Sequence, residues 1–420
     1  MKNLKVYMIC TFCTAIALTA AAESSISNVV VNQRWPWSEK VDVDFILSGD
    51  TSDVEVTATW DTHPAPYRLG TLFGCVPGQR RFTWDPAKSD FKGQTLTGFT
   101  VALSNVSVEA HKYIVVDLVD GGYEFLSDVP AGGWTAAHKS SKMVFRRISA
   151  GTYTLGEDQA TYEHLEHANP PYYATIQNRR EVTFTSDFYV GIFKYTKAQH
   201  ASLGCEVTGD ADDKPHDGLS YNDLRGEKPA INWPNTEYRV SEDSIVAKLR
   251  AKAGLVVDLC EEEQWEVAAR ANTETFWPTG GNTNETFSTH TNQVDEFVAW
   301  YGNSTGTVLQ RKQQKPVGKK AHNGWGLYDV VGLAGELTLD AAPGERNIPT
   351  TGRSYLSIDP VGDENCAKRV IRSASGNGEN TQLCELLPCR RQLADPSAAS
   401  YSTRFCIHLK PLGSLTFEGL

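Results

Sequence analysis

Residues 260–270 read CEEEQWEVAAR, and this stretch indicates a helix that packs inside a domain. Three consecutive glutamates stand where the first turn would begin, and the helix dipole favours acidic side chains there. With a helix that starts near Glu261, Trp265 falls on the same face as Ala268 and Ala269. We therefore expect Trp265 to be a core residue.

Around this helix, short strand-like segments alternate with few helices and long polar loops. The strand-like segments are residues 143–148, 181–184 and 188–192. Further helices are predicted from Thr196, an N-cap residue type, to Gly204, and from Ser241 to Gly254. Few long elements and many loops indicate an α+β domain with a largely irregular surface.

The N-terminal part of the chain is predicted to be all β. Apolar and polar residues alternate at 41–45 and 54–60, and apolar runs follow at 99–103 and 113–116. Short strands at this spacing predict a β-sandwich of Ig-like size over residues 23–127. The sequence VPAGG at 129–133 is typical of a linker, which we place at residues 128–140.

The first 22 residues have the pattern of a secretory signal. Lys2 and Lys5 precede an apolar run at 6–18, and three alanines stand before Glu23. The run is shorter than the about 20 residues that a membrane-spanning helix needs, so no membrane span is expected after cleavage. A signal over residues 1–22 predicts a secreted or periplasmic protein.

Charge and cysteine content narrow the class of protein further. The formal net charge of −11 argues against a nucleic-acid partner, because such partners need a basic surface. Nine cysteines occur, and two of them, Cys10 and Cys13, lie in the predicted signal. An odd number remains, so at least one thiol has no disulfide partner within the monomer.

Five stretches between residues 145 and 405 resemble, in order, the motifs of the formylglycine-generating enzyme (sulfatase-modifying factor) family. They are FRRISAGTYTLG at 145–156, VTF with FYVG within 182–191, CEEEQWEVAAR at 260–270, PVG with NGWGLYDVVG within 316–332, and RVIR with TRF within 369–405. The resemblance places a domain of this family at residues 141–412. The segment RWPW at 34–37 is similar to bacterial exported proteins that pair a β domain with such a domain.

The resemblance implies a loop-rich fold related to C-type lectins. Active members of the family oxidise a cysteine of a sulfatase to formylglycine, with two active-site cysteines, copper and oxygen. Calcium ions have a structural role in those members. Copper and calcium are therefore the cofactors to test for, and an exported protein or peptide is the implied substrate.

Two alignments of the family's cysteine pair remain open. Cys384 and Cys389 have the four-residue spacer of that pair, and two thiolates suit copper(I). If Arg391 instead matches the arginine downstream of the pair, Cys384 takes the second position and the first falls near Glu379. Ser375 matches the serine of the family's GGSW stretch, so it is the third candidate catalytic residue.

The calcium-binding stretch of the family is only partly matched. The family's GNVWEW stretch corresponds to GLAGEL at 332–337. Glu336 matches the glutamate that helps to hold calcium, but Leu333 has no side-chain oxygen. Since calcium takes six to eight oxygen ligands, Glu336 is predicted as the ligand of a weakened site.

These observations favour an exported binding or scaffold module with a degenerate active site. One alternative is a copper-dependent oxidase that converts a cysteine of a sulfatase or another exported protein to formylglycine. A second alternative is a structural surface protein.

The mature chain should begin near Glu23, because the small residues of the predicted signal end there. N-terminal sequencing of protein from the native host would measure this start. A mature chain that begins at Met1 would contradict the export prediction.

Overall fold

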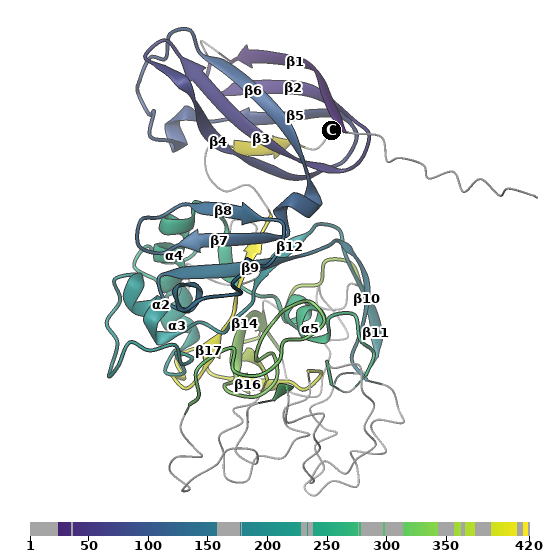
Figure 1. Ribbon diagram of the computed structural model, residues 1–420, viewed down its shortest axis with the longest axis vertical. Coiled ribbons are helices and arrows are strands. Elements are labelled where there is room, and N and C mark those ends of the chain that lie inside the picture. The colour runs from purple at the N-terminus through teal and green to yellow at the C-terminus, as the bar shows by residue number, and fades with distance from the viewer. Residues whose placement is uncertain are drawn as a thin grey trace, which may run out of the picture.

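The computed structural model describes residues 24–34, 37–157, 177, 179–227, 233, 238–275, 277–278, 297–298, 314–342, 357–362, 366–373, 388–409 and 415–418. This part of the chain is mostly β-strand with a few short helices (Figure 1). The composition agrees with the predicted α+β class in this broad sense. No helix among these residues is long and apolar enough to cross a membrane.

Two antiparallel sheets form the upper part of the molecule in Figure 1. One has the order β1(Ser25–Gln33), β2(Val41–Ser48), β5(Gly78–Trp84), β19(Leu415–Glu418). The other has the order β4(His63–Cys75), β3(Ser52–Trp60), β6(Thr100–Ser107). In β2 every second residue from Val41 to Leu47 is buried, as the alternating sequence predicts.

The two sheets share one hydrophobic core. Val43 and Phe45 of β2 and Phe82 of β5 belong to the same cluster as Val54 and Val56 of β3, and each is at most 1% exposed. Both sheets therefore bury one face against a common core. The likeness to an immunoglobulin domain stays a prediction.

The strand nearest the C-terminus belongs to the first of these sheets. β19 pairs antiparallel with β5, from Leu415 opposite Trp84 to Glu418 opposite Arg81. The chain thus returns to the N-terminal sheets just beyond residue 412, the predicted end of the second domain. A strand of four residues carries too little pattern to show from sequence which sheet it joins.

A six-stranded sheet lies below these two sheets in Figure 1. Its order is β13(Val257–Leu259), β18(Phe405–His408), β12(Phe188–Gly191), β9(Lys142–Ile148), β7(Tyr113–Asp117), β8(Tyr123–Leu126). β7 pairs antiparallel with β9, from Tyr113 opposite Arg146 to Asp117 opposite Lys142.

This pairing joins strands on the two sides of the predicted linker. The sequence predicts an N-terminal domain that ends at residue 127, whereas β7 and β8, which precede that residue, belong to the six-stranded sheet. The stretch 128–140 therefore connects neighbouring parts of one sheet, and it contains a short 3-10 helix, η3(Ala136–Lys139). An apolar run such as that of β7 predicts a strand, but it does not identify the partner strand.

Two smaller sheets complete the second part. One has the order β16(Gln392–Ala394), β15(Arg369–Arg372), β14(Glu336–Ala341), β17(Ser402–Thr403), and the other pairs β10(Gly151–Leu155) with β11(Arg180–Phe184). All six residues of β14 are buried, so this strand lies in the interior of the domain.

The three predicted helices are present with shifts at their ends, and a further short helix at Tyr221–Arg225 has no predicted counterpart. They are α2(Lys197–Ser202), α3(Tyr221–Arg225), α4(Ile245–Ala253) and α5(Glu262–Arg270). Thr196 caps α2 as predicted, whereas α4 is capped by Ser244 rather than starting at Ser241. Gly254 ends α4 in the left-handed conformation, with a φ of 65°. Trp265 of α5 is 1% exposed, which confirms the core prediction.

One disulfide ties α5 to the six-stranded sheet. It joins Cys260, which precedes the helix, to Cys406 of β18. Cys75, Cys205 and Cys389 are not in disulfides. Thiols outside disulfides agree with the odd number of cysteines in the predicted mature chain.

A buried ion cluster joins the N-terminal sheets to the six-stranded sheet. Asp53 of β3 is fully buried, and it accepts hydrogen bonds from Arg147 of β9 at 2.6 and 3.1 Å. Asp53 also lies 2.7 Å from His111 Nδ1, and Arg147 Nε donates to Asp187 at 2.6 Å. Burial raises the pKa of Asp53, but the hydrogen bonds from His111 and Arg147 outweigh burial and lower it overall.

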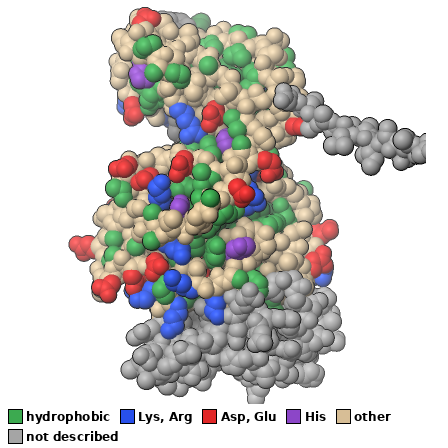
Figure 2. All heavy atoms as spheres, in the orientation of Figure 1, with side chains coloured by type: hydrophobic (Ala, Val, Ile, Leu, Met, Phe, Trp, Pro, Cys, Tyr) green, Lys and Arg blue, Asp and Glu red, His purple; other side chains and the backbone are tan. Residues whose placement is uncertain are grey.

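Aromatic contacts extend this junction. Phe73 of β4 packs against Phe125 of β8 and Tyr189 of β12, with ring centroids 6.0 and 6.2 Å apart. The Arg68 guanidinium lies 4.4 Å from the ring centroid of Tyr123. Acidic and basic side chains also gather on the visible surface around this narrow region (Figure 2).

Asp53→Asn should lower the free energy of unfolding by about 3 kcal/mol, because it leaves Arg147 buried with only part of its counter-charge. Asp44→Asn is the matched control, since it breaks the Asp44–Arg81 pair, whose arginine side chain is 38% exposed. That change should cost less than about 1 kcal/mol. Urea unfolding of both variants would measure the difference, and equal losses would show that the buried junction adds no stability.

Candidate functional site

The predicted site residues are only partly visible. Cys384, Ser375 and Glu379 lie outside the described residues, whereas Cys389 and Glu336 lie within them. The distance between Cys384 and Cys389 therefore stays a prediction. The surroundings of Cys389 and Glu336 can be compared with the chemistry expected of each.

Cys389 is fully buried, and it belongs to the hydrophobic cluster that contains Trp265. Burial, reinforced by the nearby Glu157 carboxylate, raises the pKa of the Cys389 thiol well above its ordinary value. The thiolate is the form of cysteine that binds metals and acts as a nucleophile. Cys389 is therefore a buried core thiol, and its raised pKa disfavours the thiolate form.

Charged residues of α5 form a buried network beside this thiol. Glu266 accepts hydrogen bonds from Arg270 Nε at 2.8 Å and from Arg372 Nη2 at 3.1 Å. Arg270 Nη2 also donates to Glu157 Oε1 at 2.8 Å. Burial raises the pKa of Glu266, but Arg270 and Arg372 outweigh it, so the carboxylate stays ionised.

One turn earlier on α5, Glu262 extends the network. Arg391 Nε donates to Glu262 at 2.7 Å, and Arg372 Nη2 lies 2.7 Å from the same carboxylate. Arg372 Nη1 also donates to the carbonyl of Pro388 at 2.7 Å. Residues 373 and 388 flank the segment that carries Ser375 and Cys384, so Arg372 ties together the two ends of that segment.

Glu336 of β14 lies in a second buried cluster, away from solvent. It accepts hydrogen bonds from Trp265 Nε1 at 2.8 Å and from Arg404 Nε at 3.1 Å, and it pairs with the ammonium of Lys194. Lys194 Nζ also donates to the carbonyl of Ala334 at 2.9 Å. All three of Lys194, Arg404 and Glu336 are at most 1% exposed.

These residues do not fit the predicted calcium ion. Calcium takes six to eight oxygen ligands, but Glu336 faces two cationic side chains and an indole N–H. Leu333, three residues before Glu336, has no side-chain oxygen that could bind calcium. Among the residues that the structure describes, no group of three or more His, Cys, Asp or Glu side chains is placed to hold a metal.

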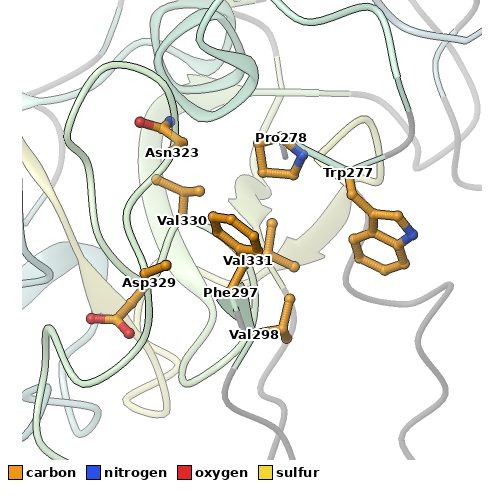
Figure 3. Close-up of a pocket in the computed structure, with 9 residues that line it drawn as sticks. Trp277, Pro278, Phe297, Val298, Asn323, Asp329, Val330 and Val331 are labelled. Carbon is orange, nitrogen blue, oxygen red and sulfur yellow. The ribbon is translucent and has the colours of Figure 1, made fainter. Parts of the chain in front are cut away.

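A small apolar cavity lies nearby, and Figure 3 shows its lining. It is lined by Trp277, Pro278, Phe297, Val298, Ala321, Asn323, Asp329, Val330 and Val331, and its volume is about 10 Å³, which is close to that of one water molecule. The Asp329 carboxylate points away from the apolar side chains in Figure 3, and it accepts a hydrogen bond from the Gly318 N–H at 2.7 Å. The cavity is thus a gap in the core rather than a ligand site.

A larger groove of about 830 Å³ opens beside α2, α3 and α4. The ring centroids of His200 and His216 are 4.4 Å apart there, and Lys248 Nζ lies 3.4 Å from Cys205 Sγ. Burial, and then His216, lowers the pKa of His200 to about 4, so that imidazole is neutral at pH 7. The groove is also lined by the acidic residues Glu206, Asp223, Glu227 and Asp243.

Sequence reasoning missed this groove. Its two histidines come from a helix and from a separate loop, so no local motif links them. The nearest sequence signal is the acidic character of residues 206–243, which by itself is typical of any solvated surface.

Alkylation of the folded, mature chain with iodoacetamide should modify Cys205 and spare Cys389 and Cys75. Cys205 is half-buried beside a lysine, whereas burial raises the pKa of Cys75 to about 12 and that of Cys389 well above its ordinary value. Peptide mass spectrometry would read each site, with alkylation in denaturant as the control. Labelling of Cys389 as fast as Cys205 would contradict its assignment as a core thiol.

Comparisons with known proteins identify the family of this chain. A search of solved structures finds PvdO from Pseudomonas aeruginosa, at 19% identity and a TM-score of 0.45, over 63% of this chain and 94% of that one. No curated protein matches significantly. The family described as the sulfatase-modifying factor enzyme 1-like domain matches residues 134–398, which is more than half of the chain. The chain therefore belongs to this family, as its five motifs predicted.

Proposed function

We propose that this protein is an exported module of the sulfatase-modifying factor family that binds or scaffolds a partner and does not oxidise cysteine. The observation that carries the proposal is the state of Cys389. This thiol is 0% exposed, and it packs in the hydrophobic cluster that contains Trp265.

A copper(I) site of the formylglycine-generating type needs two thiolates that converge on one metal ion with room for the substrate. Cys389 is packed inside a hydrophobic cluster, so this thiol has no open side for both a copper ion and a substrate. In the other alignment Glu379 takes the first position, and a carboxylate is a hard ligand that suits copper(I) poorly. Both alignments therefore favour a domain without the oxidase reaction.

The groove beside α2, α3 and α4 supports a binding role. Its volume of about 830 Å³ falls within the range of about 300–1,000 Å³ that is usual for ligand sites. Acidic side chains outnumber Lys248 along its lining, and the buried His200 is neutral. A segment of an exported protein or peptide with basic or hydrogen-bonding side chains would complement this surface.

Two features support export. The first 22 residues have the pattern of a secretory signal, and the Cys260–Cys406 disulfide suits an oxidising compartment. A structural role at the cell surface remains the alternative, and a retained anchor or a tightly bound surface partner in the native host would favour it.

The test is to incubate the mature protein with copper(I), oxygen and a peptide that carries a sulfatase cysteine motif, and to search for aldehyde by mass spectrometry. We expect no aldehyde above the level of a reaction without protein. Copper-dependent aldehyde that is lost in both Cys384→Ser and Cys389→Ser, but kept in Cys205→Ser, would overturn the proposal and establish the oxidase.

A further inference from the structure

Lys194 follows β12, and its side chain is completely buried. Its ammonium pairs with Glu336 Oε1, and it donates to the Ala334 carbonyl at 2.9 Å. Burying an ammonium group is costly unless anions and hydrogen-bond acceptors surround it. The lysine is therefore held in place by oxygen atoms of one short segment, residues 334–336.

The Glu336 carboxylate oxygen and the Ala334 carbonyl oxygen form the kind of environment in which proteins bind a metal cation. A carboxylate and a backbone carbonyl converge on one point, and both are oxygen ligands of the type that hard cations prefer. In this protein the Nζ atom of Lys194 occupies that point. The second oxygen of Glu336 is taken by Arg404 Nε at 3.1 Å and by Trp265 Nε1 at 2.8 Å.

We propose that the Lys194 ammonium is a built-in cation that takes the place of a calcium ion at Glu336, so that this domain is folded and stable without calcium. The lysine supplies positive charge and N–H donors where an ion would supply positive charge alone. A divalent ion that approached Glu336 would meet two fixed cations within a few ångströms, and that repulsion is strong where water is excluded.

Lys194 is placed so that its side chain can link the segments that a calcium ion at Glu336 would otherwise link. The segment after β12 is tied through Lys194 to β14, while Trp265 joins α5 to the same carboxylate. Arg404, between β17 and β18, also donates to the Gly191 carbonyl of β12 at 2.7 Å. A calcium ion would cross-link the same segments only reversibly, whereas a lysine does so at any calcium concentration.

The direct experiment uses the unaltered mature chain. After treatment with EDTA, equilibrium dialysis against radioactive calcium should show no stoichiometric binding, and calcium chloride should leave the thermal unfolding midpoint unchanged. A site filled at 100 times its dissociation constant would instead raise the midpoint by about 3 °C. About one equivalent of bound calcium together with such a rise would overturn the proposal.

A pair of variants tests the role of the lysine separately. Lys194→Gln removes the charge and keeps most of the side-chain length, so it should lower the unfolding midpoint by several degrees, about 5 °C or more. Lys197→Gln is the matched control, because Lys197 lies three residues away at the start of α2 and outside this cluster. Equal unfolding midpoints for the two variants would show that Lys194 does not act as a structural cation.

Discussion

The carboxylate of Glu336 takes hydrogen bonds from three segments that are far apart in the chain: α5 through Trp265, the segment after β12 through Lys194, and the start of β18 through Arg404. A buried carboxylate stays ionised only when paired and hydrogen-bonded. These segments therefore have to meet at β14 for the charge to be tolerated. The arrangement of these segments depends on this constraint, and the Cys260–Cys406 disulfide links two of them, because Cys260 precedes α5 and Cys406 follows Arg404.

The pairing of buried carboxylates with cations also occurs on α5. Glu262 and Glu266, one turn apart, face Arg372 and Arg391, and both carboxylates are fully buried or nearly so. Such pairs add little net stability over apolar packing, but removing one partner is costly. A domain with few long helices and strands has a limited choice of regular packing surfaces. We infer that its buried ion pairs define which segments lie side by side.

Local features of this fold could be predicted from sequence, and distant pairings could not. The cap of α2 at Thr196 and the buried face of Trp265 depend on residues within one or two turns. The Lys194–Glu336 pair, in contrast, joins positions 142 residues apart, and neither residue stands in a recognisable motif for the other. The spacing of Cys384 and Cys389 predicted a possible copper-binding pair. Spacing alone does not show that Cys389 is buried beside Glu157.

The two parts of the molecule are linked by the buried Asp53–Arg147 pair and by the pairing of β19 with β5. A cut there would separate β7 from β9, and loss of the C-terminal residues would remove β19 from the edge of β5. Either change would expose sheet edges, which readily pair with other chains. The Asp53–Arg147 pair would also lose one partner from a buried position. The N-terminal sheets and the six-stranded sheet are therefore joined by a buried ion pair, and the chain returns to the N-terminal sheets at β19.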